Sequence, residues 1–497
     1  SSSSSSSSEV GGGVRVTRGA AKRAAAAAAA AKAKEKEEKE EKEASAPPQG
    51  EGTRRPTVAI IGSGIAGLTS AHLLSGTHDV TVYEANTKGG LSGAGMEFEG
   101  TFIDCPLRII GDGYYAFVQS LVRSIDVKLA PIREDSMEQQ NIGDNGPGGA
   151  IELAFRRSWL ANLWNMAPHF TDFLRFRRNI YSSASSQDLA SNPDSPDNVK
   201  TWGMWMEEHG YDTAPYLNPQ GGATDQSAVM WLVMGQASWM LSCTYCQVLG
   251  YPAKVILDFF RGIQQGSRIS DTVAFSSGRG GRHMRVTPSM RSLELALSYG
   301  SRLQYGQAVA KVDSAKRVVN GTRFDHVIIA TEAKAVCRVL DQPSFPANLE
   351  VFSRIQYQPS SIILHTDHTL MPTKRSQWCD FNVFQKKSED MCMLTAWLNQ
   401  YYPDATFPFD VFETWNCYHR PPADKILKEV HFLRVVNNKD TPRNLADIAS
   451  CQGVNSVYFA GAYSYYGMGL LEQAARSAKR VAEMIKARSA TSASSAS

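Results

Sequence analysis

The sequence predicts an α/β protein in which a three-layer domain with a central parallel sheet is interrupted by an α+β domain with a mixed or antiparallel sheet. Three observations lead to this expectation. A strand, a glycine-rich turn and a helix follow one another at residues 57–84, and the same succession returns at residues 456–487. Between them, residues 353–436 show the alternating apolar pattern of antiparallel strands. At 497 residues, the chain is also too long for a single hydrophobic core.

The first glycine turn has the spacing of a dinucleotide-binding βαβ unit, the repeating element of a Rossmann-type domain. It lies between an apolar strand at residues 58–61 and a helix that leads to a second strand. Gly62 allows a tight turn, Gly64 lets the backbone approach a pyrophosphate, and Gly67 lets the helix pack closely on the sheet. Glu84 ends the second strand, where a carboxylate can bond the hydroxyls of a ribose. The alternative is a glycine-rich turn that binds nothing.

The residues expected to bind the nucleotide come from this unit and from the segment after it. They are Gly62, Ser63, Gly64, Ile65, Ala66, Gly67, Glu84, Gly89, Gly90 and Leu91. The helix that begins near Ile65 offers free backbone N–H groups and a partial positive charge to phosphates. Gly89 and Gly90 either let the backbone pass close to a cofactor or form an ordinary turn.

Further elements follow from the periodicity. We expect a strand or hairpin at 97–108, helices at 115–125 and 289–298, a hairpin from 307–313 and 316–320, and a buried strand at 326–331. Residues 226–253 contain no charged residue, which raises the question of a membrane span. Glutamine, serine, glycine and proline interrupt the segment, and this favours a buried helix lining an apolar pocket.

These patterns predict the organisation of the chain. A nucleotide-binding domain is expected from residues 56–130, 271–345 and 452–490, and a substrate domain from residues 131–270 and 346–451. Residues 1–55 and 491–497 are expected to be disordered tails, because neither can bury a core. Residues 1–31 are rich in Ser, Ala, Arg and Lys and contain one acid, Glu9. That composition resembles a plastid or mitochondrial transit peptide; a featureless tail on a cytoplasmic protein is the alternative.

The composition of the chain excludes several classes of function. Residues 1–55 carry the whole net charge of +3, so the remaining chain is neutral and gives no electrostatic reason to bind nucleic acid. Eight scattered cysteines are not a disulfide framework and indicate a reducing compartment. Cys243 and Cys246 form a CxxC in an apolar stretch, where we expect two buried residues rather than a metal or redox site. No metal site and no transmembrane segment are expected, while peripheral contact with a membrane stays open.

The second glycine turn suggests which nucleotide is bound. A strand at 456–460, a glycine- and tyrosine-rich turn at 461–469 and a helix at 470–487 succeed one another. In one compact site, the first helix would hold the pyrophosphate, and the last would direct its positive end at the pyrimidine edge of a flavin. This division suits FAD, because a nicotinamide cofactor would need only the first unit. The alternative is a strand and helix that merely close the sheet.

These motifs resemble the flavin-containing amine oxidase and phytoene-desaturase-like superfamily of FAD-dependent oxidoreductases, and are most similar to its "predicted NAD/FAD-binding protein" subgroup. The matching segments are 58–74 with Glu84 and 89–90, 324–331 (FDHVIIAT), 362–367 with 370–372, and 458–461 with 471–472. The resemblance implies that the backbone of Val309 holds the adenine. It also implies that Gly461, Leu471 and Glu472 face the ribityl chain and pyrimidine edge of FAD.

The sequence departs from this superfamily at three places. One is the closing motif, GMGLLEQAARSA, which lacks the His-Glu pair of several subgroup members. Leu91 stands where many relatives have an arginine that touches the cofactor. No lysine can be matched to the one near flavin N5 of amine oxidases, which argues against amine oxidation. The expected function is therefore an FAD-dependent oxidoreductase that passes a hydride from an organic, lipophilic substrate to flavin N5, with O₂ or another acceptor reoxidising the cofactor. An NAD(P)-linked dehydrogenase and a non-catalytic FAD-binding protein are the alternatives.

No catalytic residue is assigned from the sequence. Arg108 either compensates a flavin or substrate charge or forms an ion pair. His365 and Asp367 lie on an apolar strand, where a satisfied core pair is expected rather than catalysis. The tyrosines of the last glycine turn either stand over the flavin or fill space; they are Tyr463, Tyr465 and Tyr466.

Overall fold

The computed structural model describes residues 54–111, 113–132, 139–142, 151–155, 164, 167–183, 199–217, 227–264, 283–340, 342–386 and 388–494. The expected transit peptide and nearly all of the N-terminal tail lie outside the described residues, as do residues 495–497. From Arg55 onward, the described residues belong to one compact unit.

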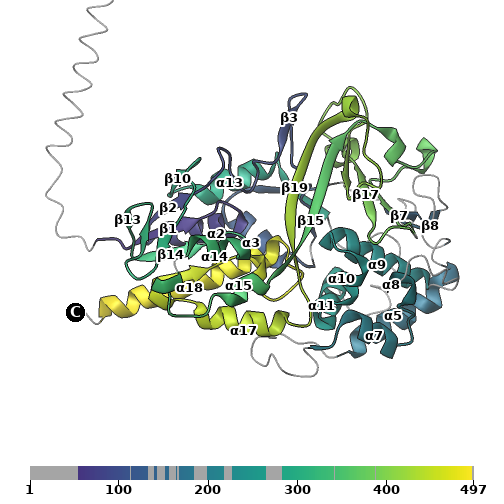
Figure 1. Ribbon diagram of the computed structural model, residues 1–497. Helices are drawn as coiled ribbons and strands as arrows, with labels where there is room; N and C mark the ends of the chain where they lie inside the picture. Colours follow the sequence, from purple (N-terminus) through teal and green to yellow (C-terminus); the bar gives the residue numbers. More distant parts are fainter. Residues whose placement is uncertain are drawn as a thin grey trace, which may run out of the picture. The chain divides into compact units, whose positions relative to one another are not determined.

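A five-stranded parallel sheet is the centre of the first domain (Figure 1). Its order is β10 (Arg302–Gln304), β2 (Asp79–Tyr83), β1 (Thr57–Ile61), β14 (His326–Ile329) and β20 (Val457–Phe459). β14 lies between β1 and β20 and pairs in parallel with both. Three segments far apart in the sequence therefore share one sheet. Because the strands are parallel, their carboxyl ends lie along one edge, and the turns after β1 and β20 both begin there.

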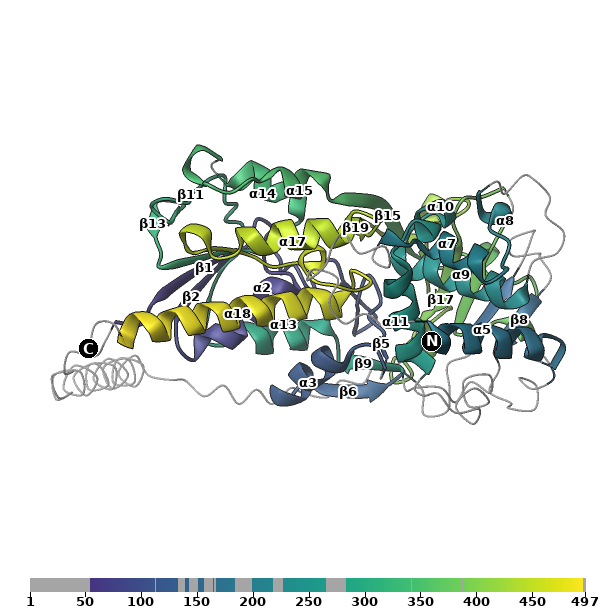
Figure 2. The same ribbon diagram turned by 90° about the horizontal axis from the view of Figure 1, so that it is seen from below.

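Helices cover both faces of this sheet, which gives the expected three layers (Figure 2). One face carries α2 (Ile65–Ser75), α3 (Ala116–Ser124), α13 (Met290–Ser298) and α18 (Leu471–Ser494). The other carries α14 (Ala333–Val339), α15 (Glu350–Arg354), α17 (Thr441–Cys451) and a meander of β11 (Val312–Asp313), β12 (Val318–Val319) and β13 (Thr322–Arg323). Val58 and Ile60 pack on the first face, and Ala59 and Ile61 on the second. A strand buried on both faces explains the continuous apolar run in the sequence.

The second domain is built on a seven-stranded sheet. Its order is β19 (Ile426–Val436), β15 (Gln356–His365), β18 (Phe412–Trp415), β17 (Met393–Trp397), β16 (Phe381–Phe384), β7 (Gln139–Ile142) and β8 (Ile151–Phe155). β16 and β7 are parallel and the other neighbours are antiparallel, so the sheet is mixed, as expected. The predicted α/β fold class with a parallel sheet and a separate mixed sheet is confirmed. The exact domain boundaries stay a prediction.

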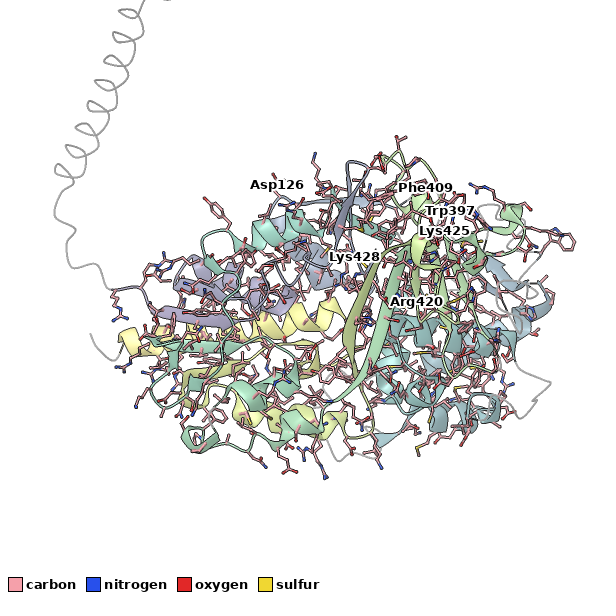
Figure 3. The ribbon with its side chains drawn as sticks, turned by 45° about the horizontal axis from the view of Figure 1, so that its top comes forward. Asp126, Trp397, Phe409, Arg420, Lys425 and Lys428 are labelled. Atoms are coloured by element: carbon pink, nitrogen blue, oxygen red, sulfur yellow. The ribbon has the colours of Figure 1, made fainter. Side chains whose placement is uncertain are left out.

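Helices pack around a large apolar core beside the mixed sheet. They are α5 (Phe170–Ser182), α7 (Trp202–Glu208), α8 (Ala214–Leu217), α9 (Ala228–Leu241), α10 (Tyr245–Leu249) and α11 (Ala253–Gln264), with α16 (Leu398–Tyr401) between β17 and β18. Smaller antiparallel pieces link the two domains: β3 (Met96–Phe98) with β4 (Thr101–Ile103), and β5 (Ile110–Gly111) with β9 (His283–Thr287) and β6 (Lys128–Pro131). Lys428 of β19 donates to the carbonyl of Gly95, 2.9 Å away, and so ties the long strand to the segment before β3 (Figure 3).

The uncharged segment at 226–253 is two helices rather than one. α9 ends at Ser242, whose φ of 51° is left-handed, and α10 begins after Thr244, whose hydroxyl and backbone form a capping box with Gln247. Both helices contribute buried side chains to the apolar core, as predicted. Among the residues that the structure describes, no helix combines the length and apolarity needed to cross a membrane.

Two local predictions are wrong in part. The hairpin predicted from residues 307–313 and 316–320 is confirmed, since β11 and β12 pair antiparallel, but its first strand is wrong in length. It is limited to β11, because the backbone N–H of Gln307 instead donates to the carbonyl of Glu84 at the end of β2. Cys243 is buried as expected, but Cys246 is exposed. The physical reason is the capping box, since Cys243 precedes the helix while Cys246 lies in its first turn on the outer side.

Candidate functional site

The first glycine turn has the tight geometry that its sequence predicts. Gly62 has a φ of +106°, which side chains rarely adopt, and its N–H donates to the carbonyl of Tyr83, 2.8 Å away. A Cβ at Gly67 would lie 1.9 Å from the oxygen of Gly62, so α2 presses directly against the turn. A Cβ at Gly64, in contrast, would meet no atom within 4 Å. The turn is therefore closed toward the sheet and open at Gly64.

The start of α2 is suited to an anion. Gly64 is its N-cap residue and supplies no side-chain acceptor, and the first turn contains no acidic residue. The first N–H groups of a helix lack partners within the helix and carry a partial positive charge. These are the groups of Ile65, Ala66 and Gly67, and they lie beside the open position at Gly64.

Glu84 holds the glycine turn together. One carboxylate oxygen, Oε2, accepts from the N–H of Ser63 at 3.0 Å and from the Ser63 hydroxyl at 2.6 Å. The other, Oε1, accepts from the N–H and the side-chain amide of Asn86, at 2.9 and 2.8 Å. The carboxylate thus connects the ends of β1 and β2. The predicted contact with a ribose remains a prediction, because the structure shows only these protein donors.

The segment after β2 returns to the same turn. The N–H of Gly90 donates to the hydroxyl of Ser63 at 2.7 Å, and a Cβ at Gly90 would lie 3.0 Å from the nitrogen of Gly64. Gly89 packs against Glu294, whose oxygen would be 1.8 Å from an added Cβ. Leu91 is buried in the apolar layer under the sheet. The structure therefore brings Gly90 to the first glycine turn, while the side chain of Leu91 packs in the hydrophobic core.

The second glycine turn joins β20 to α18. The N–H of Gly461 donates to the hydroxyl of Ser477 at 2.9 Å, and an added Cβ would touch the ring of Tyr463. Gly467 and Gly469 have φ values of +134° and +74°, so the chain needs glycine at both positions before the helix begins. Since β20 and β1 flank β14, both glycine turns lie along one edge of the parallel sheet.

The other residues predicted to contact the cofactor have partners within the protein. The carboxylate of Glu472 accepts from the N–H groups of Phe117 and Val118, both at 2.9 Å, and therefore caps α3. Any contact of Glu472 with a flavin would thus go through its backbone. Leu471 opens α18 and packs partly against the same apolar layer. Val309 is 8% exposed and follows the segment that bonds to Glu84.

Ionisable groups gather inside the protein between the two domains of the fold. Burial raises the pKa of Asp104 to about 7 and that of Glu413 to about 8, although each carboxylate accepts a backbone N–H, from Met290 and Leu107 respectively. Arg108 lies within the electrostatic reach of both carboxylates, and burial lowers its pKa. Of these groups, the sequence singled out only Arg108.

Two further members of this cluster were also not found from the sequence. Glu413 lies on β18 and Arg434 near the end of β19, and burial followed by the charge of Arg108 lowers the pKa of Arg434. Glu413 is a lone charge in a fully buried strand, and that pattern was an available signal, because a charge on a buried strand needs a reason. Arg434 gave no such signal, since its strand also carries Lys428, Glu429 and His431.

Other candidates have structural roles. Nε2 of His365 lies 2.7 Å from the Thr414 hydroxyl, and burial lowers its pKa to about 4, so the expected core role of His365 is confirmed. Asp367 caps the short turn that follows, through Thr369. Tyr463 is buried in the core on one face of the parallel sheet, and the hydroxyl of Tyr466 donates to Asp258 at 2.6 Å. The space-filling alternative therefore holds for these two tyrosines.

The fold and its first glycine turn are those of a Rossmann-like domain. Residues 60–125 match the family described as NAD(P)-binding Rossmann-like domain. Over 87–88% of its length, the chain shares the fold of a cyclohexylamine oxidase, a putrescine oxidase and a putative protoporphyrinogen oxidase. No curated protein sequence matches the chain.

Solved structures share this fold at low sequence identity. The CLA-producing fatty acid isomerase from P. acnes has a TM-score of 0.59 and 12% identity, over 87% of this chain and 98% of its own. Cyclohexylamine oxidase from Brevibacterium oxydans IH-35A has a TM-score of 0.57 and 15% identity, over 87% and 100%. A putrescine oxidase bound to putrescine has a TM-score of 0.55 and 13% identity, over 87% and 99%. At such identities the likeness concerns the fold, and the reactions named are those of the other proteins.

Proposed function

We propose that this protein is an FAD-dependent oxidoreductase. The observation that carries the proposal is the pair of glycine turns, each opening a helix, at the same edge of one parallel sheet. The matched Rossmann-like family and the flavoenzyme fold support it. Two long helices whose N-termini lie at one sheet edge suit a cofactor with a pyrophosphate and a second electron-rich group.

The residues present fit the adenosine and pyrophosphate half of FAD. Gly64 leaves open space in front of free N–H groups, and a Cβ added at Gly90 would lie 3.0 Å from the nitrogen of Gly64, so a third stretch of backbone passes close by. Glu84 fixes the turn that presents these groups. We propose that Val309 supports the adenine and that Gly461 and the start of α18 support the flavin end. Bound FAD would supply hydride-accepting redox chemistry, with O₂ or another acceptor restoring it.

The protein's own residues would bind and enclose the substrate. The helical part of the second domain has a core rich in Trp, Phe and Tyr, and such surroundings favour a lipophilic organic molecule over a polar one. Enclosing the reaction in an apolar space excludes water and strengthens each charge–charge interaction there. A catalytic side chain is not part of the proposal.

A visible spectrum of the purified full-length protein tests the proposal. We expect the absorbance bands of an oxidised flavin, and release of FAD, identified by mass, when the protein is denatured. A folded, colourless protein that takes up no added FAD would refute the proposal. If the same protein binds NADH instead, the NAD(P)-linked dehydrogenase is correct. A bound flavin that no reductant or acceptor pair turns over would favour a non-catalytic FAD-binding protein.

We also propose that residues 1–31 direct the protein to a plastid or mitochondrion, from their composition alone. A fluorescent protein fused after residue 55 should then enter the organelle, and a fusion that lacks residues 1–31 should stay in the cytosol. Equal distribution of the two fusions would contradict the targeting role.

A further inference from the structure

Two tryptophans meet at a right angle on one face of the mixed sheet. The ring centres of Trp378 and Trp397 lie 5.3 Å apart, and the ring planes are 88° from each other. Along β17, Leu394 and Ala396 pack in the large apolar core, whereas Trp397 packs against a separate small cluster that contains Trp378 and Phe412. Because side chains alternate along a strand, this cluster lies on the opposite face of the sheet. The two rings therefore form an aromatic corner away from that core.

Hydrogen bonds hold both indole rings in place. Nε1 of Trp378 donates to the carbonyl of Pro372 at 2.7 Å, and Nε1 of Trp397 donates to a carboxylate oxygen of Asp410 at 3.1 Å. The side chain of Asp410 is only 13% exposed. The face of an indole ring is electron-rich and attracts cations. Two fixed rings with a carboxylate beside them thus have the composition of a cage for an organic cation.

In this structure the cage holds the chain's own Arg375. The guanidinium carbon of Arg375 lies 4.6 Å from the centre of the Trp378 ring and 5.3 Å from that of Trp397. Nη1 and Nη2 both donate to the carboxylate of Asp410, Nη2 at 2.9 Å. The rings and the carboxylate therefore already accommodate a planar cation, and the protein itself supplies it.

Arg375 is held in a way that lets another cation replace it. Its side chain is 60% exposed, and it begins a single turn of 3-10 helix, η6 (Arg375–Gln377). Exposed ion pairs contribute little to stability, because water solvates both ions well when they separate. The two indole rings keep their own hydrogen bonds when the arginine moves out. An external cation can therefore enter without unfolding the walls of the cage.

The composition of the cage indicates which cation it takes. It offers aromatic faces and one carboxylate. A quaternary ammonium has no N–H donors to satisfy, whereas a primary ammonium is strongly hydrated and would lose its water. Phe409, directly before Asp410, is 47% exposed and lies at the same end of the molecule as Trp397 (Figure 3). It adds apolar surface beside the cage, which suits the methyl groups of such a cation.

We propose that Trp378, Trp397 and Asp410 form a binding site for a quaternary ammonium group of the choline type, and that Arg375 is its internal competitor. Binding exchanges the guanidinium for the ligand and releases Arg375 to solvent. Choline can arrive as a free molecule or as the headgroup of phosphatidylcholine, and the cage recognises the group that both share. The site does not involve the cofactor, so its test and that of the proposed function can fail separately.

Ligand-observed NMR titration of the full-length protein with choline and its neutral isostere 3,3-dimethyl-1-butanol tests the inference. We expect choline to bind at least about fivefold more tightly than the alcohol. Arg375→Gln removes the competitor and should strengthen choline binding about three- to tenfold. In that background, Trp397→Leu and Asp410→Asn should each weaken it at least about fivefold. Arg420→Gln is the matched control, since Arg420 is also 60% exposed and pairs with Glu429 on the surface (Figure 3).

Thermal unfolding confirms that each variant is folded, and if Trp397→Leu does not fold, Asp410→Asn decides by the same criterion. Equal affinity of Arg375→Gln for choline and the alcohol overturns the inference, because the arginine is then only a stabilising ion pair. Choline binding that the cage variants leave unchanged overturns it as well, because the ligand then binds elsewhere.

Sedimentation with phosphatidylcholine vesicles identifies the source of the quaternary ammonium group. Retention of the wild-type protein that Trp397→Leu abolishes assigns the group to a lipid headgroup. Choline binding without retention assigns it to a free molecule. Both results support the inference.

Discussion

Replacing Gly64 by alanine separates cofactor binding from folding. An added methyl group meets no protein atom within 4 Å, and the backbone angles of −68° and 179° suit alanine. The smaller entropy of the unfolded chain stabilises the variant by about 0.4–1 kcal/mol, while alanine is a poorer N-cap than glycine by a similar amount. We therefore expect the unfolding free energy of flavin-free protein to change by less than about 1 kcal/mol.

The same methyl group lies where a pyrophosphate must approach the backbone. Overpacking a closely fitted contact costs about 1–3 kcal/mol, which corresponds to FAD binding that is about 5- to 150-fold weaker. Gly67→Ala is the contrasting variant. Its methyl group would lie 1.9 Å from the oxygen of Gly62, a backbone atom that moves only with the turn. That variant should lose both stability and FAD.

Urea unfolding of flavin-free protein and titration with FAD, followed by quenching of flavin fluorescence, measure the two effects separately. The reasoning is refuted if Gly64→Ala binds FAD with wild-type affinity. It is equally refuted if Gly64→Ala unfolds as easily as Gly67→Ala, because the open space would then be an incorrect description of the turn.

Three further predictions concern side chains near the site. Glu84→Gln places an amide N–H₂ group against the donors of either Ser63 or Asn86. The unfolding free energy of flavin-free protein, measured in urea, should therefore fall by about 1–3 kcal/mol. Unchanged stability would show that the four hydrogen bonds contribute little. Glu472→Ala removes the cap of α3 and should lower the unfolding free energy by about 1–2 kcal/mol, measured in the same way, whereas an unchanged midpoint would contradict the capping role. Burial raises the folded-state pKa values of Asp104 and Glu413 to about 7 and about 8, so the folded protein binds more protons than the unfolded chain above about pH 4. The unfolding free energy should therefore fall as pH rises toward 8, by on the order of 9 kcal/mol for the two groups together. Glu413→Gln should flatten that fall in urea titrations between pH 5 and 8, and identical slopes for both proteins would refute it.

The parallel sheet could be predicted because its signals are local. Each of the strands β1, β14 and β20 is a continuous apolar run, and two of them lead directly into a glycine turn. Gly62, Gly64 and Gly67 are spaced within one turn and one helix start, so their geometry follows from neighbouring residues alone. The mixed second sheet followed likewise from alternation along each strand.

The charged cluster could not be predicted, because its members meet only in the folded chain. Glu413 accepts from the backbone of Leu107, which lies about three hundred positions earlier in the sequence. Glu472 shows a second limit of local patterns: its predicted cofactor contact stays a prediction, but the partners of its side chain could not be foreseen. Its partners are the N–H groups of Phe117 and Val118, which no local pattern connects with it.

The parallel sheet made from three segments sets the order of events during synthesis. β1 and β2 can pair as soon as they leave the ribosome. The other edge of β1 stays unpaired until β14 has been made, and the far edge of β14 stays unpaired until β20 has been made. Unpaired strand edges invite association with other chains, so the nascent chain depends on protection until β20 has been made. The second glycine turn follows β20, so a cofactor that needs both turns can bind only after that point.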